Sequence, residues 1–515
     1  MRRLLSWIWP LLPLLCGFYI PVFIAVLDDV ALGSIEVAFS SVVTSIPVII
    51  STVILAISAA FLATLIGAVD ALLISGVRGV TSGRLRFLWV PLLILTFTTP
   101  PAAVASAIQS TFGSSFLVAG VRDEFGALIL LSLRWAPVAL AILLGLSLTI
   151  PREQEWALRL LPPVKALKVR WQLQRNWRRA CMLLLFLLML PAAEIPSYAG
   201  IETISRRVMA RLTVGDGLSG WILSAGLAGI VGPLLAWLMP GNQWWGRGLK
   251  TLSPAGLPTW KFASGWWILR VVPAISLILI LIYTAWPRAS EVELAKSEFL
   301  SALWDGIIEI QRALLVSVLS VLCCWRLAVA KRKWALWAWC LPTFLPASLL
   351  GLSLASTWGV HAPVFLDRIP WLLSLAHIVQ LGALSALAGI LAVSMIPEEE
   401  ANAARFVKPE IACWRIFLPR SLPVLIPASI MGAILILGEV ESTLLLAPPG
   451  HPSPALELHQ LLHFFLQYLN NRKLLNLNTL DLLSWIKVLF HQRSFCQSKL
   501  RVVQHRLEPL GQPFR

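Results

Sequence analysis

The sequence predicts an all-α polytopic membrane protein with two parallel six-helix repeats, about 12 transmembrane helices in all, the last one doubtful. Hydrophobic residues make up 58% of the 515 residues and charged residues only 13%, whereas soluble domains are about 45–50% apolar and about 25% charged. Long uncharged stretches recur along the chain, and the chain matches itself when shifted by 246 residues. This composition argues against an ordinary cytosolic enzyme and against a disordered or fibrous chain.

Eleven stretches are long and apolar enough to cross a bilayer, which takes about 20 residues. In chain order they are 7–27, 37–69, 87–121, 125–150, 180–199, 218–239, 262–286, 307–325, 334–355, 369–396 and 422–446. Prolines inside several of them predict kinks, which neighbouring helices can accommodate. Basic residues before the first stretch also suit a secretory signal, but prolines interrupt it, so we expect a retained first span.

The charges predict the orientation. The chain has 42 Lys and Arg against 26 Asp and Glu, a net charge of +16. If the N-terminus is cytoplasmic and the spans alternate, the inside segments hold 23 Lys and Arg and the outside segments hold 7. Short inside loops are enriched in these residues, so we expect a cytoplasmic N-terminus. This bias explains the basic residues without a nucleic-acid partner.

The internal repeat is carried by polar and proline matches. Pro100 falls on Pro346, the loop 150–159 falls on 396–405, and Glu194 falls on Glu439 at a shift one residue smaller. Each repeat holds about six spans, and an even number makes the repeats parallel. The predicted domains are a first half at 1–245, a second half at 246–463 and a tail at 464–515.

The tail departs from the pattern. A twelfth span is expected there, but charged residues interrupt it, and the best run, 474–490, suits a poor span or an interfacial amphipathic helix. We expect the tail to be divergent, or truncated by a frameshift.

The two loops that the repeat superposes both contain Ile-Pro-x-Glu. They read IPREQEWALR (150–159) and IPEEEANAAR (396–405), with a proline start, early acidic residues and a later arginine, the features of a capped helix. We expect each loop to be a docking helix for a cytoplasmic partner; the alternative is a solvated loop that only sets topology. The residues concerned are Glu153, Ala157, Arg159, Glu399, Glu400, Ala403, Ala404 and Arg405.

The stretch 398–428 resembles the EAA loop of the membrane subunits of binding-protein-dependent ABC importers, roughly E-A-A-x3-G-x9-I-x-L-P. One placement uses residues 400–401 (EA) and 416–419 (IFLP), with the second Ala and the Gly replaced. The other, which the repeat favours, takes 403–405 (AAR) as the core, with a spacer two residues short. The residues that the resemblance adds are Leu418 and Pro419.

The segment 437–450 (LGEVESTLLLAPPG) resembles the fused, two-half permeases of the ferric-iron and thiamine type. The first loop departs further, because Pro162 stands where the family has Gly and no I-x-L-P follows. The two halves are therefore expected to couple unequally to their partners.

The resemblance implies a permease subunit of the bacterial inner membrane that forms the pathway for a small solute, with ferric iron or thiamine as the subgroup's candidates. It implies two cytoplasmic ABC ATPase subunits and a periplasmic substrate-binding protein as partners. The chain has no phosphate-binding GxxxxGK[ST] loop. ATP hydrolysis is thus expected on a partner, and neither enzymatic activity nor a cofactor is expected of this chain.

Ionisable residues inside spans are costly and often functional. Glu194 and Glu439 lie near the outer ends of their spans, where they could attract a cationic solute or act as structural carboxylates. Arg134 lies deeper, has no counterpart in the second half, and could line the pathway or pair with a carboxylate. His377 is expected to be a packed, hydrogen-bonded residue, and no metal site is predicted.

Two other functions stay open. An ion-driven secondary transporter would also have twelve spans in two parallel halves, but loop 76–86 lacks the Asp of the major-facilitator motif. A decayed or non-transporting permease would explain the weak first loop and the tail.

Overall fold

The computed structural model describes the greater part of the predicted spans. The described residues are 9–32, 35–76, 124–147, 160–162, 165, 168–169, 171–172, 175–192, 195–196, 201–214, 216–238, 292–359, 370–394, 396, 398–439 and 441–447. All of them belong to one compact unit, Met1–His459; the second unit, Gln460–Arg515, lies outside them. The predicted spans 87–121 and 262–286, the loop residues 151–159 and the tail 464–515 also fall outside.

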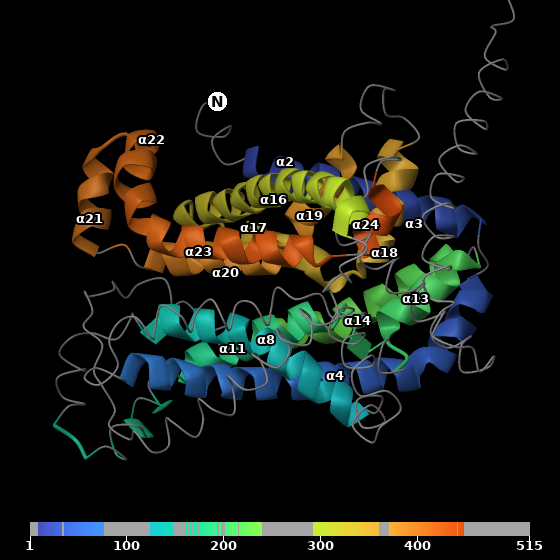
Figure 1. The fold of residues 1–515 in the computed structure, drawn as a ribbon, viewed down its shortest axis with the longest axis horizontal. Coiled ribbons are helices and arrows are strands. Elements are labelled where there is room, and N and C mark those ends of the chain that lie inside the picture. Colours follow the sequence, from blue (N-terminus) through green and yellow to red (C-terminus); the bar gives the residue numbers. More distant parts are fainter. Residues whose placement is uncertain are drawn as a thin grey trace, which may run out of the picture. The chain divides into compact units, whose positions relative to one another are not determined.

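Regular structure in the described residues is helical, with no strand among them (Figure 1). The helices are α2 (Leu12–Leu14), α3 (Ile20–Leu32), α4 (Ile35–Gly76), α8 (Glu124–Ser147), α11 (Arg175–Met189), α13 (Ile204–Thr213), α14 (Gly217–Leu238), α16 (Val292–Val329), α17 (Lys333–Cys340), α18 (Ala347–Leu354), α19 (Trp371–Gln380), α20 (Gly382–Ser394), α21 (Glu398–Ala403), α22 (Pro409–Ile411), α23 (Leu418–Leu437) and α24 (Glu441–Leu446). The short 3-10 and π segments between them are η1 (Trp9–Leu11), η2 (Leu15–Tyr19), η5 (Leu341–Phe344), η6 (Ala355–Gly359), η8 (Ala404–Phe406) and η9 (Ala412–Phe417).

By length and composition, 5 helices within the described residues can cross a membrane, or up to 7 if each of two bent pairs is one span. The 5 spans are Trp9–Ala31, Val42–Ala71, Glu124–Leu143, Trp304–Val329 and Ala412–Leu437. The predicted class, an all-helical multi-pass membrane protein, is therefore confirmed. The arrangement as twelve helices in two repeats stays a prediction.

Helices α4, α8 and α11 pack on one another. Small residues allow α4 and α8 to approach closely: Ala59 and Ala63 are fully buried, and a Cβ on Gly67 would lie 2.9 Å from the carbonyl carbon of Ala139. The hydroxyl of Ser132 donates to the carbonyl of Ala59 at 3.3 Å. Close packing of small residues is what holds helices together in a lipid environment.

Helices α16, α20 and α23 form a second set that packs pairwise. A Cβ on Gly389 of α20 would lie 2.9 Å from the backbone of Cys324 on α16. The indole of Trp325 on α16 donates to the hydroxyl of Ser421 on α23 at 2.9 Å. Both sets thus combine tight backbone contact with a hydroxyl hydrogen bond between helices.

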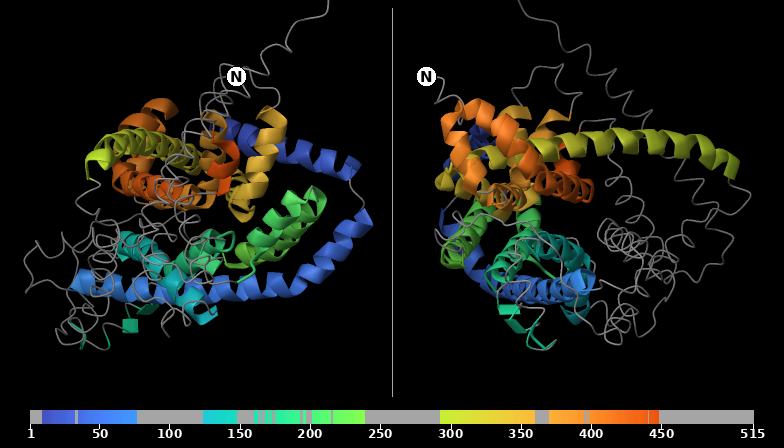
Figure 2. Two further views of the ribbon diagram at one scale, coloured as in Figure 1. Left: turned by 45° about the vertical axis from the view of Figure 1, so that its right-hand side comes forward. Right: turned by 90° about the vertical axis from the view of Figure 1, so that its left-hand side faces the viewer.

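The shift found in the sequence relates the two sets. Shifted by 246, α8 falls on residues 370–393, which are α19 and α20, and α4 overlaps α16. Shifted by 245, α11 falls on 420–434 within α23. In Figures 1 and 2, α4, α8 and α11 lie side by side, as do α16, α20 and α23.

The N-terminal segment packs on helices of both halves: the indole of Trp221 on α14 donates to the carboxylate of Asp29 on α3 at 2.8 Å. Its helices pack on α16, α18 and α19, and the indole of Trp358 donates to the carbonyl of Cys16 at 2.9 Å. The hydroxyl of Tyr19 donates to the carbonyl of Ala338 at 3.4 Å. The first span therefore contacts helices of the second half.

Two predicted spans are sharply bent instead of straight. Span 334–355 bends by 100° between α17 and α18, where Pro342 and Pro346 interrupt the helix. Span 369–396 bends by 56° between α19 and α20. No proline lies at this second bend, so it needs another cause.

The cause is the hydroxyl of Thr343, which lies between two backbone groups of the bent span. It donates to the carbonyl of Gln380 at 3.2 Å and accepts from the amide of Ala383 at 3.1 Å. A side chain inserted in this way breaks the helical ladder. The glycine at the bend, Gly382, lies directly against the carbonyl oxygen of Trp339, where a Cβ would not fit.

Candidate functional site

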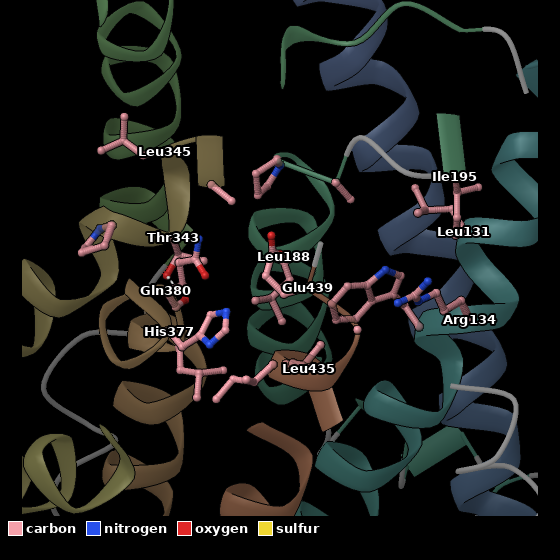
Figure 3. Close-up of a pocket in the computed structure, with 18 residues that line it drawn as sticks. Leu131, Arg134, Leu188, Ile195, Thr343, Leu345, His377, Gln380, Leu435 and Glu439 are labelled. Atoms are coloured by element: carbon pink, nitrogen blue, oxygen red, sulfur yellow. Dashed lines mark hydrogen bonds between the residues drawn. The ribbon is translucent and has the colours of Figure 1, made fainter. Parts of the chain in front are cut away.

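A cavity of about 160 Å³ lies between helices of the two sets (Figure 3). Its wall contains residues of α8, α11 and α19 and of the segment that follows α23. Most lining side chains are apolar; the polar ones include Arg134, Thr343, His377, Gln380 and Glu439. An apolar cavity with a few converging polar groups is the usual form of a small-molecule site.

Positions related by the 246-residue shift both line this cavity. Three residues of α8 line it at the spacing i, i+3, i+4, which places them on one helix face. The residues 246 positions later, on α19 and the turn after it, line it as well. The matching pairs are Leu131 with His377, Arg134 with Gln380, and Trp135 with Leu381.

The sequence predicts no counterpart for Arg134. The position 246 residues later holds Gln380, a neutral residue that can hydrogen-bond but carries no charge, so a search for a second charge misses it. The two residues are therefore related in position but differ in charge, since Arg134 is a cation and Gln380 is neutral.

Arg134 extends to the end of α23. A Cβ on Gly438 would lie 3.3 Å from Nη2 of Arg134, so the guanidinium lies against the backbone next to Glu439. Figure 3 shows Arg134 on the α8 side of the cavity and Glu439 between it and His377. A residue larger than glycine at position 438 would press on the arginine.

Glu439 lies in a break in the predicted span 422–446, which the sequence analysis treats as continuous. Helix α23 ends at Leu437 and α24 begins at Glu441. The carboxylate of Glu439 accepts from the amide of Ser442 at 3.0 Å, and its carbonyl accepts from the hydroxyl of Thr443 at 2.8 Å. These bonds satisfy the start of α24, which explains why the chain begins a new helix there.

A chain of buried polar groups leads from α16 to the cavity. On α16, Arg312 donates to the carboxylate of Glu309 with Nε at 2.8 Å and also with Nη2. Nη1 of Arg312 donates to Ser374 at 3.2 Å and to Nδ1 of His377 at 3.3 Å. His377 is only 1% exposed, and its Nε2 lies 3.2 Å from the hydroxyl of Ser442.

The chemistry of these groups sets the direction of the bonds. An arginine only donates, so Nδ1 of His377 must accept, and the proton of the neutral ring lies on Nε2. That proton is donated to Ser442, whose amide in turn donates to Glu439. His377 is thus packed and hydrogen-bonded, as the sequence predicts, and it connects Arg312 with the segment that carries Glu439.

The second Ile-Pro-x-Glu loop forms the helix expected of it, α21, followed by η8, in which Arg405 lies. Arg420 holds this loop to α23, since its Nε donates to the carboxylate of Glu400 at 3.0 Å. The other residues predicted here differ in exposure: Glu399, Ala403 and Pro419 are exposed, Leu418 is half-buried and Ala404 is buried.

Apolar side chains next to α21 face away from the rest of the chain. Phe406 is 92% exposed and Ile411 is 44% exposed, and the charged residues Lys408 and Glu410 lie between them. Figure 1 places α21 and α22 beyond one end of α20 and α23. We call Phe406, Val407 and Ile411 the loop surface; exposed apolar groups of this kind commonly mark contact sites.

Four predicted residues, Glu153, Ala157, Arg159 and Glu194, lie outside the described residues. The structure adds Arg312, Thr343, Gln380 and Ser442, none of which the sequence assigned to a site. Two of them had a signal in the sequence, since Gln380 lies 246 residues after Arg134 and Ser442 lies 245 residues after Ser197.

Comparison with known proteins adds no identity: no family model, no curated protein and no solved structure matches the chain. Among the described residues, no group of three or more His, Cys, Asp and Glu side chains could hold a metal ion. The cavity and the loop surface are therefore the two features of the chain that bear on its function.

Proposed function

We propose that this chain is the permease subunit of an ABC importer and forms the membrane pathway for a small solute. The cavity supports a pathway, because both helix sets contribute to it and repeat-related positions line it. Transport proteins built from two repeats typically bind their solute at the repeat interface. Arg134 and Glu439 are the residues we assign to the pathway in the described part of the chain.

The observation that carries the proposal is the position of α23. One end of this helix bears the loop surface and the Glu400–Arg420 pair, and its other end bears Gly438 and Glu439 at the cavity. A helix of 20 residues is roughly 30 Å long. A partner that moves the loop can therefore move the cavity wall through one rigid element.

The partner we propose is a cytoplasmic ABC ATPase, one for each loop, with a periplasmic binding protein on the opposite side. Exposed Phe406 would enter a groove on the ATPase, and the Glu400–Arg420 pair would hold α21 at a fixed angle. This proposal places the N-terminus in the cytoplasm of a bacterial cell. The catalytic step lies on the ATPase and not on this chain.

Co-purification with candidate ATPase subunits tests the proposal. We expect Phe406→Asp to reduce the amount of ATPase retained at least tenfold, because a charge replaces an apolar contact, while the chain still elutes as a folded protein. Val214→Asp is the matched control, since Val214 is 82% exposed and follows α13 on the predicted outer side.

Charge reversals compare the two loops. Glu399→Lys with Arg405→Glu should release the ATPase from the second loop, and Glu153→Lys with Arg159→Glu should do so less if the first loop couples weakly. If a folded chain retains no ATPase, or if Phe406→Asp and Val214→Asp behave alike, the importer proposal is wrong.

A secondary transporter is the second candidate, and the buried chain from Glu309 to His377 favours it. Ionisable groups in membrane helices often carry protons in ion-driven transport. Solute uptake into proteoliposomes that follows an imposed proton gradient, with no ATPase present, would support this alternative.

A further inference from the structure

We propose that the cavity selects a small zwitterion, a solute that carries a carboxylate and an ammonium group a few bonds apart. The inference deepens the proposed function and rests on the cavity being part of a transport pathway. Its basis is that Arg134 and Glu439, two side chains of opposite charge, line the same small, largely apolar cavity.

Side chains of opposite charge line the cavity. Among the described lining residues, one side chain is a permanent cation, Arg134, and one is a carboxylate, Glu439. They come from two different elements, α8 and the segment after α23. Burying one charge of a solute without an opposite charge is costly in apolar surroundings. A solute with one charge finds an opposite charge in only one of these groups, whereas a zwitterion finds one in each.

The placement of the two groups sets the size of the solute. Nη2 of Arg134 lies against the backbone of Gly438, and Glu439 is the next residue along the chain. The two charges of the solute must therefore be close together. A cavity of about 160 Å³ has room for a short hydrocarbon link between them.

Both groups already have partners. Arg134 and Glu439 each make further polar interactions in the structure, so a solute would exchange contacts with them. Exchange of this kind costs affinity, and it favours a solute that can replace the contacts of both groups at once. The neutral polar residue Gln380 also lines the cavity and can orient the solute.

His377 and Ser442 act as positioning residues in this site. Their hydrogen bond holds the start of α24, and the amide of Ser442 donates to the carboxylate of Glu439. Replacement of His377 should therefore change the affinity for the ammonium end of a solute more than the affinity for its carboxylate end.

The test is a binding measurement on the purified full chain without any ATPase. Calorimetric titration compares β-alanine with butyrate, which lacks the ammonium group, and with n-butylammonium, which lacks the carboxylate. Glycine and γ-aminobutyrate vary the separation of the two charges. We expect at least one zwitterion to bind at least tenfold more tightly than both single-charge probes.

Substitutions at positions 134 and 439 test which side chain binds which end of the solute. Arg134→Gln should weaken zwitterion binding at least tenfold and leave n-butylammonium unchanged, whereas Glu439→Gln should leave butyrate unchanged. Arg134→Lys keeps the charge and should keep most of the affinity, which separates loss of binding from loss of folding. Arg206→Gln and Glu410→Gln make the same chemical changes at exposed positions outside the cavity and should have no effect.

The outcomes separate this inference from the proposed function. If no zwitterion exceeds the single-charge probes on a folded chain, or if n-butylammonium binds as tightly, the inference is overturned, while ATPase retention still tests the importer. If a zwitterion binds as expected and no ATPase is retained, the site stands and the importer proposal fails.

Discussion

The helices α8 and α19, which both line the cavity, are related by the 246-residue shift, but the chain follows a different course after α19, where it bends into α20. Helix α8 runs without a break although Pro137 lies inside it, whereas α19 and α20 meet at 56° although no proline lies at Leu381. Proline content alone would predict the reverse. The bend comes from Thr343, a residue of another element, so the shape of this wall is set by a tertiary contact.

The largest effect is expected at the bend itself, from Gly382→Ala. The new methyl group would meet the carbonyl oxygen of Trp339, a backbone atom that no side-chain rotation can move aside. We expect a loss of about 3 kcal/mol or more in unfolding free energy, measured by SDS titration in mixed micelles. Gly226→Ala is the control, because nothing lies within 4 Å of that added methyl group. Equal stability of the two variants would show that the close contact at the bend is not needed.

Thr343→Val tests the cause of the bend directly. The substitution keeps the shape of the side chain but removes the hydroxyl that pairs with Gln380 and Ala383. Two buried backbone groups lose a partner, so we expect a loss of about 2 kcal/mol in the same titration. Thr343→Ser retains the hydroxyl and should lose less than about 1 kcal/mol. If valine is as stable as threonine, the bend has another origin.

His377→Leu tests whether the buried polar chain stabilises the bent side of the cavity. Arg312 would lose one acceptor and Ser442 one donor, although leucine recovers part of the cost through apolar burial. We expect a net loss of about 1 kcal/mol. Leu131→Met is the matched change at the related position of α8, where volume is conserved and no hydrogen bond is lost. A larger loss for Leu131→Met than for His377→Leu would contradict this assignment.

Pro137→Ala should have the smallest effect. Helix α8 already packs closely against α4 around its proline, and membrane helices tolerate such residues. Unfolding free energy should stay within about 1 kcal/mol of the unsubstituted chain. A larger gain in unfolding free energy would mean that Pro137 strains α8. Both α8 and the bent segment α19–α20 would then depart from a regular helix, and they would differ only in how much.

Local pattern was sufficient to predict the helical class and most span positions, because hydropathy is a property of consecutive residues. The 246-residue shift was also visible in the sequence, but Gln380 was not recognised at the position related to Arg134, because it carries no charge. Local pattern could not give the bend at Leu381, because Thr343 lies 37 residues away from Gln380 in the chain. The contact between Arg312 and His377 spans 65 residues and was equally invisible.

The break at Glu439 was missed for a related reason. The surrounding residues are apolar enough for a continuous span, and only the carboxylate bond to the amide of Ser442 shows that a new helix begins. Sequence reasoning therefore located this residue near the cavity but not the backbone interruption that presents it.

The packing of the first span on later helices has a consequence for how the protein is made. Trp358 and its acceptor Cys16 are separated by 342 residues. At a synthesis rate of about 5–20 residues per second, the first span waits roughly 17–70 s for this partner to emerge. During that time it lies in the membrane without its neighbours from the second half. Two separately expressed halves divided near residue 245 should therefore reassemble only when the first span finds the other fragment.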